Sequence, residues 1–189
     1  MAFLLCVEFG DYGVVLKAGS SVSGYLIGRY AFGGKMEQLR SLIEQFRLAM
    51  EALSPHDFDG TSLAVSEFPH ACCDDCSQLL AAYLTDNGFP QAKLIRGENG
   101  GFGQELGSHV WLYLNGLHID ITADQFNEYG YDNPSVILSD HSEFLSTFEV
   151  QDNGTADYRI HLKKYSSPGL ESEFESCYRI VLEQLSAQA

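Results

Sequence analysis

Apolar and polar residues alternate on both sides of an Asn-Gly dipeptide in the segment 108–124, which reads SHVWLYLNGLHIDITAD. Asn115 and Gly116 both tolerate the positive φ of a type I′ turn, so the pattern predicts a β-hairpin with these two residues as its loop. In that register one face of the hairpin is wholly aliphatic and must point into a core. The pairs on this face are Leu114 with Leu117, Leu112 with Ile119, and Val110 with Ile121.

The opposite face of the predicted hairpin carries the side chains that could take part in catalysis. His109 faces Thr122 directly and Asp120 diagonally, and diagonal Cα atoms about 7–8 Å apart allow the two side chains to meet in a hydrogen bond. A histidine beside a carboxylate is typical of a general base with the acid that orients it. The other members of this face are Trp111, Tyr113 and His118.

A helix with clear start and stop signals is predicted within the segment 68–90, FPHACCDDCSQLLAAYLTDNGFP. Pro69 keeps the entering chain extended, so the helix should begin near Cys72 or Cys73. The Asn87-Gly88 pair provides the C-terminal cap. The apolar stripe of this helix consists of Leu79, Leu80, Tyr83 and Leu84.

A thiol in the first turn of a helix lies beside N–H groups without helical partners and at the positive end of the helix dipole. Both features favour the thiolate, which is the form that attacks carbonyl carbons. The next two residues, Asp74 and Asp75, oppose this effect because their charges disfavour a second negative charge nearby. An imidazolium partner would have to outweigh them, and His109 is the candidate.

These elements, in this order, resemble the transglutaminase-like branch of the papain-like fold: a cysteine that opens a helix, a histidine that starts a strand (H-x-W), and an aspartate on the next strand. The resemblance is closest to bacterial transglutaminase-like proteins in which FP-x-x-x-C precedes a helix and HVWL…G…IDITADQF closes the motif, and it covers about residues 66–140. It implies an α+β papain-like fold with the catalytic helix packed on an antiparallel β-sheet.

Carried over by position, the resemblance implies Cys73 as the nucleophile, His109 as the base and Asp120 as the residue that orients the base. The choice of Cys73 over the adjacent Cys72 rests on the FP-x-x-x-C alignment. The interval from His109 to Asp120 is short for transglutaminases proper and implies a tight hairpin.

Such a triad acts on an amide, thioester or ester carbonyl through an acyl-enzyme and needs neither a cofactor nor a metal ion. Water as the acceptor gives a peptidase or amidase, and an amine gives a transglutaminase or amide ligase. We expect a peptide or protein substrate, with Trp111, Gly107 and Ser108 lining its site. Packing cover is the alternative role for Trp111, and the glycine-rich loop that ends at Ser108 is either a lid or a solvated connector.

The remaining pattern predicts one domain, 1–189, in which 66–140 carry the catalytic motifs. The segment 1–34, with alternating Phe3, Leu5, Val7 and Phe9, is predicted to be an extension of short strands. Amphipathic helices are predicted for 36–53 and for the C-terminal segment around Phe174. Further strands are predicted at 92–96, 136–138 and 158–162, the last because Tyr158, Ile160 and Leu162 alternate with polar residues.

Composition narrows the class of protein. The chain has 189 residues, 45% of them hydrophobic, and a formal charge of −15, which argues against nucleic acid and anionic membranes as partners. Five cysteines, three of them within residues 72–76, do not form the pattern of a disulfide framework. We find no secretory signal and no membrane span, and therefore expect a cytoplasmic protein with reduced thiols, with export by a route lacking a cleavable signal left open.

Two alternatives use other chemistry. His70, Cys72, Cys73 and Cys76 could hold zinc, since C-x-x-C at a helix start is a spacing found in zinc sites. A deaminase would add an upstream C-x-E, which Cys6-Val7-Glu8 supplies, but this alternative gives no role to His109 and Asp120. The second alternative is an acidic binding or inhibitory protein that uses the same fold without catalysis.

Overall fold

The computed structural model describes residues 23–188. The chain divides into two compact units, residues 1–38 and 39–189. Helix α1 is assigned to Ser23–Glu51. The expected strands at Phe3–Phe9 lie outside the described residues, whereas the strand prediction is wrong for 23–34, which are helical. Apolar residues in this stretch recur at three- and four-residue spacing, as in Leu26 and Tyr30, and this spacing suits a helix.

The amphipathic helix predicted for 36–53 is confirmed up to Glu51. The segment that follows contains two short 3₁₀ turns, η1 (Pro55–Asp57) and η2 (Ser62–Ala64). From residue 39 onward, one face of α1 is buried in the core because its apolar residues recur at helical spacing. The buried residues of this face include Leu39, Leu42, Ile43, Phe46 and Met50.

Helix α2 (Cys73–Asp86) begins and ends where the sequence predicts, with Cys72 at the N-cap and Asn87 at the C-cap. Gly88 follows with a φ of 86°, a left-handed conformation that glycine adopts without strain. The middle of α2 is buried, and its apolar stripe belongs to the same core as the aliphatic face of the hairpin. The N-terminus of α2 is therefore held close to the sheet.

Five strands of the described chain form one antiparallel sheet, so the protein is of the α+β class. The strand order is β4-β3-β2-β1-β5. The strands are β1 (Lys93–Glu98), β2 (His109–Leu114), β3 (Leu117–Asp120), β4 (Ile137–Ser139) and β5 (Glu149–Thr155). The predicted strands at 92–96 and 136–138 correspond to β1 and β4.

The predicted register of the hairpin is confirmed. Leu112 pairs with Ile119 and Leu114 with Leu117. The two loop residues, Asn115 and Gly116, have φ values of 52° and 87°. The residue types of the turn and the alternation along the strands therefore determine together which side chains lie on each face of the hairpin.

The strand predicted at 158–162 is wrong, because this segment forms helix α3 (Tyr158–His161) followed by η5 (Leu162–Tyr165). The Asp157 side chain accepts a hydrogen bond of 3.0 Å from the backbone N–H of Arg159 and so caps the helix. Tyr158, His161 and Leu162 are buried, and their spacing of three and four residues is that of a helix face.

Helix α4 (Pro168–Gln188) confirms the predicted C-terminal helix, and its buried residues include Phe174, Cys177 and Val181. Within residues 23–188, no helix combines the length and the apolar character needed to cross a membrane. The four cysteines in this part of the chain are free.

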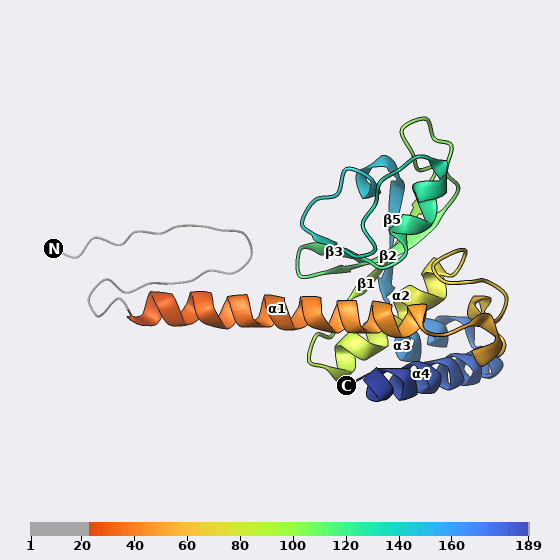
Figure 1. Ribbon diagram of the computed structural model, residues 1–189, viewed down its shortest axis with the longest axis horizontal. Coiled ribbons are helices and arrows are strands. Elements are labelled where there is room, and N and C mark those ends of the chain that lie inside the picture. The colour runs from red at the N-terminus through yellow and green to blue at the C-terminus, as the bar shows by residue number, and fades with distance from the viewer. Residues whose placement is uncertain (1–22, 189) are drawn as a thin grey trace. The chain divides into compact units, whose positions relative to one another are not determined.

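Hydrophobic clusters cover both faces of the sheet. The aliphatic face of the hairpin packs with α2, α4 and residues 39–50 of α1 in the larger cluster. Trp111, on the opposite face, belongs to a second cluster built from η3 (Ala123–Tyr129), β4 and the segment around η4 (Leu145–Thr147). Figure 1 shows α2 and α4 on one side of the sheet and this teal and light-blue segment on the other. The face with the predicted chemistry is therefore enclosed.

Candidate active site

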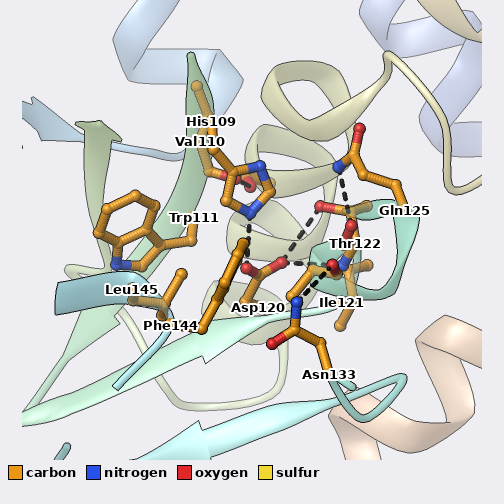
Figure 2. A network of polar contacts seen from close by, with 12 residues as sticks. His109, Val110, Trp111, Asp120, Ile121, Thr122, Gln125, Asn133, Phe144 and Leu145 are labelled. Carbon is orange, nitrogen blue, oxygen red and sulfur yellow. Dashed lines mark hydrogen bonds and ion pairs between the residues drawn. The ribbon is translucent and has the colours of Figure 1, made fainter. Parts of the chain in front are cut away.

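The hairpin brings His109 and Asp120 together as the diagonal relationship predicts. His109 Nε2 lies 2.6 Å from Asp120 Oδ2, and both side chains are buried. The other carboxylate oxygen, Oδ1, accepts hydrogen bonds from the Thr122 backbone N–H at 2.8 Å and the Thr122 hydroxyl at 3.1 Å. Figure 2 shows Asp120 between the imidazole ring and Thr122. Asp120 is thereby fixed in an orientation that presents one oxygen to the histidine.

The second ring nitrogen of His109, Nδ1, is buried and has no hydrogen-bond partner within residues 23–188. It points away from Asp120 (Figure 2). Burial of the ring by itself lowers the pKa of His109, but the charge and hydrogen bond of Asp120, together with the nearby Cys73 thiol, outweigh burial and raise the pKa from 6.5 to about 10. The raised pKa favours the protonated ring, and Nδ1 is the ring nitrogen left for the sulfur of Cys73.

Aromatic rings surround His109. The Phe126 ring meets the imidazole edge-on at a centroid distance of 5.0 Å, and the Trp111 and Phe148 rings both lie 5.8 Å away. Gly97 pairs with His109 across the sheet, and a Cβ at Gly97 would come within 2.6 Å of the Phe148 side chain. Glycine at this position therefore allows the aromatic cluster to close over the histidine and exclude water.

The three clustered cysteines have different surroundings. Cys72 and Cys76 are buried in the larger core with their sulfur atoms 3.5 Å apart, and burial raises the pKa of Cys76 well above its usual value. Cys73 is only partly buried and lines a pocket of about 450 Å³. Of the three, Cys73 is the thiol that a substrate can reach.

The acidic residues that follow Cys73 have partners of their own. Asp74 forms an ion pair of 2.9 Å with Arg96, and Asp75 accepts hydrogen bonds of 2.7 and 2.5 Å from the Ser62 backbone and hydroxyl. Because Arg96 offsets the charge of Asp74, the opposition that this carboxylate offers to a thiolate at Cys73 is reduced.

Two further residues position the site: Gln125, for which the sequence predicts a structural bond to the backbone near the turn, and Arg47, which was not predicted. Gln125 donates to the Thr122 carbonyl at 2.7 Å and accepts from the Ala71 backbone N–H at 3.3 Å, so it links the Asp120 turn to the chain entering α2. Arg47 of α1 donates to the Ile121 carbonyl at 2.5 Å. The sequence contained one signal for Arg47. It follows Ile43 by four residues and therefore lies on the apolar face of the helix, where a charged residue needs a partner.

The residues expected to line the substrate site lie in different places. Ser108 lines the pocket beside Cys73, whereas Gly107 is exposed and does not line it. Trp111 is fully buried, and its indole N–H donates to His118 Nδ1 at 3.0 Å. Burial lowers the pKa of His118, which suits its role as a neutral acceptor. Trp111 thus packs in the core behind His109 instead of lining the pocket.

The zinc alternative gains no support from the geometry. Within residues 23–188, no group of three or more histidine, cysteine or acidic side chains is arranged to hold a metal ion. Cys72 and Cys76 face each other in the core, while His70 and Cys73 line the pocket. Cys6 of the proposed C-x-E lies outside the described residues.

Comparisons with known proteins give no independent indication of function. No model of a known protein family matches the chain, and neither a curated protein nor a solved structure is similar enough to count as a match. The chemistry of the site itself therefore carries the functional argument.

Proposed function

We propose that this protein is a thiol-dependent hydrolase or acyltransferase that acts on an amide, thioester or ester carbonyl through Cys73, His109 and Asp120. The observation that carries the proposal is the state of His109. One of its nitrogens is bonded to Asp120 at 2.6 Å, and the other has no bond within the described chain, while the Cys73 thiol contributes to its raised pKa. This is the arrangement that an activated cysteine requires.

In this mechanism the Cys73 thiolate attacks the carbonyl carbon, and a carbon–sulfur bond forms as the carbonyl electrons move to oxygen. The tetrahedral intermediate then collapses, and His109 Nδ1–H gives its proton to the departing amine, alcohol or thiol. An acyl-enzyme results. Water or an amine next attacks the acyl carbon and loses a proton to His109 Nδ1, and the second collapse releases the product and restores the thiolate.

The start of α2 can stabilise the oxyanion that forms in both steps. Cys73 is the first residue of the helix after the Cys72 cap, so its backbone N–H has no partner inside the helix. A backbone N–H at this position, at the positive end of the helix dipole, is suited to a developing negative charge. We assign this N–H as one oxyanion donor.

The described architecture supports a papain-like, transglutaminase-like arrangement as part of the proposal. A helix begins with the nucleophile and packs against an antiparallel sheet, and the base and the acid lie on two neighbouring strands of that sheet, β2 and β3. The free cysteines of the described chain agree with the cytoplasmic location that we propose.

Alkylation by iodoacetamide at neutral pH, followed by peptide mapping, tests the proposal. We expect Cys73 to react faster than Cys72, Cys76 and Cys177, because a neighbouring imidazolium favours its thiolate. Asp120→Asn should slow the reaction, since the unoriented ring stabilises the thiolate less. His141→Gln, which alters an exposed histidine that does not line the Cys73 pocket, should leave the rate near that of the unaltered protein.

Two outcomes would contradict the triad. One is selective labelling of Cys72, which would mean that the alignment is displaced by one residue. The other is slow labelling of every cysteine in the folded protein, which would favour a binding protein that does not use a catalytic thiol.

A further inference from the structure

The pocket that Cys73 lines is also lined by a carboxylate, Glu128. Glu128 is exposed, and no ion pair or side-chain hydrogen bond involves it within residues 23–188. No lysine or arginine is among the residues that line this pocket, His70 is its one basic side chain, and Glu128 is its one carboxylate. The pocket therefore presents an unpaired negative charge on the same surface as the proposed nucleophile.

Three other carboxylates near the pocket, unlike Glu128, have ion-pair or hydrogen-bond partners. Asp74 is paired with Arg96, Asp75 accepts two hydrogen bonds from Ser62, and Asp124 of the same 3₁₀ helix is paired with Arg47 at 2.7 Å. Among these four carboxylates only Glu128 remains for a ligand, which singles it out from the general acidity of the chain.

The 3₁₀ helix η3 places Glu128 and Tyr129 side by side at the pocket. The segment is anchored by Phe126, whose ring packs edge-on against His109, and by the two hydrogen bonds of Gln125. Tyr129 is 62% exposed and lines the same pocket. A carboxylate next to an exposed aromatic ring is a surface that attracts a cation, by charge and by cation–π contact.

We propose that the acyl donor of this enzyme carries a positively charged group close to the scissile carbonyl, such as the side chain of lysine or arginine, and that Glu128 selects it. This inference rests on the proposed function, because it assigns the substrate class of the Cys73 site. The formal charge of −15 on the whole chain adds a long-range attraction for the same substrates.

We assign the positive charge to the acyl donor and not to an acceptor amine, because an acceptor amine has to lose its charge before it reacts. An amine attacks only when it is neutral, and a carboxylate that binds its ammonium form stabilises the unreactive state. An acyl donor needs no such deprotonation, and its charged group can stay beside Glu128 through both steps.

Three thiosulfonate reagents of similar size but different charge provide the first test. Trimethylammonioethyl, ethyl and sulfonatoethyl methanethiosulfonate each react with a thiolate to form a disulfide and release methanesulfinate. After correction for their rates with a free thiol, we expect the cationic reagent to modify Cys73 about tenfold faster than the anionic one. Glu128→Gln should remove most of this preference, and Glu128→Lys should reverse it.

Glu149→Gln is the matched control, because Glu149 is an exposed carboxylate on β5 that does not line the pocket. It changes the net charge by the same amount as Glu128→Gln. Equal effects of the two variants would overturn the assignment of Glu128 and leave only the charge of the whole chain as the cause.

Blocked arginine, leucine and glutamate aminomethylcoumarin amides provide the second test. We expect the arginine amide to be cleaved best, and Glu128→Gln to raise KM for this substrate without changing that for the leucine amide. Cleavage without charge preference would overturn the inference while leaving the proposed function intact. Slow reaction of Cys73 even with the neutral thiosulfonate would instead refute the proposed function.

Discussion

Arg47 and Asp124 form a two-pronged ion pair, with Nη1 lying 2.9 Å from Oδ1 and Nη2 lying 2.7 Å from Oδ2. The same guanidinium donates to the carbonyl of Ile121, the residue that follows Asp120. Helix α1 therefore holds the turn through which the sheet passes into η3. Because this turn carries Asp120 and Thr122, a residue far away in the sequence fixes the acid of the proposed triad.

Replacing Arg47 should be costly. Arg47→Met retains most of the apolar stem but leaves the Asp124 carboxylate and the Ile121 carbonyl without their donor, and we expect a loss of about 3 kcal/mol in the free energy of unfolding. Arg40→Met is the control, because Arg40 pairs with Glu44 at 3.8 Å and both side chains are about half exposed. The control should change stability by less than about 0.5 kcal/mol. Urea unfolding measures both, and equal losses would refute the role given to Arg47.

Stability should depend on pH through His109. The folded-state pKa of about 10 lies above the ordinary value of 6.5, so the protonated ring stabilises the fold fully below about pH 6.5. This contribution is lost as the pH rises toward 10. Urea unfolding measured across this range should show a declining free energy, and His109→Gln should flatten the decline. A decline of the same size in the variant would assign the effect to other groups.

Gly100 should not tolerate a side chain. A Cβ at this position would lie 2.1 Å from the Phe148 ring, so Gly100→Ala must displace the aromatic cluster over His109. We expect a loss of about 1–3 kcal/mol in unfolding free energy and faster solvent access to the histidine. At Gly169, in α4, a Cβ would meet no atom within 4 Å, so Gly169→Ala should be neutral or stabilising. Thermal unfolding compares the two.

Gln125 should influence the thiol without contacting it. Gln125→Ala removes the amide that joins the Ala71 backbone to the Thr122 carbonyl, and we expect Cys73 alkylation to slow by about threefold to tenfold. Gln151→Ala, on the exposed strand β5, serves as the control and should leave the rate unchanged. An unchanged rate in Gln125→Ala, with the fold intact by circular dichroism, would show that the start of α2 is held by other contacts.

Local sequence signals were sufficient for the hairpin and for α2. The positive φ of Asn115 and Gly116 and the alternation on both sides of them leave one register, and this register brings His109 to Asp120. The start of α2 follows from Pro69, which keeps the entering chain extended. These predictions succeeded because each depends on residues within a few positions of one another.

The failures have different physical causes. At 158–162 an alternating pattern of five residues fits a strand as well as a helix, and the cap at Asp157 decides in favour of the helix. Strand β5 is polar and largely exposed, so hydrophobicity gives no sign of it. The cluster that encloses His109 is assembled from Phe126, Phe144 and Phe148. These residues lie in or directly beside two short 3₁₀ helices, and no local pattern in the sequence predicts that they meet.

The enclosure of His109 also has a spectroscopic consequence. The ring proton between Nε2 and Asp120 is covered by aromatic side chains and has no contact with solvent, so it should exchange with water far more slowly than the proton of an exposed imidazole. A resonance that stays visible far downfield in the proton spectrum of the free protein would then give a direct reading of the charge state of the site. It could be followed while the thiol is modified or a ligand is added.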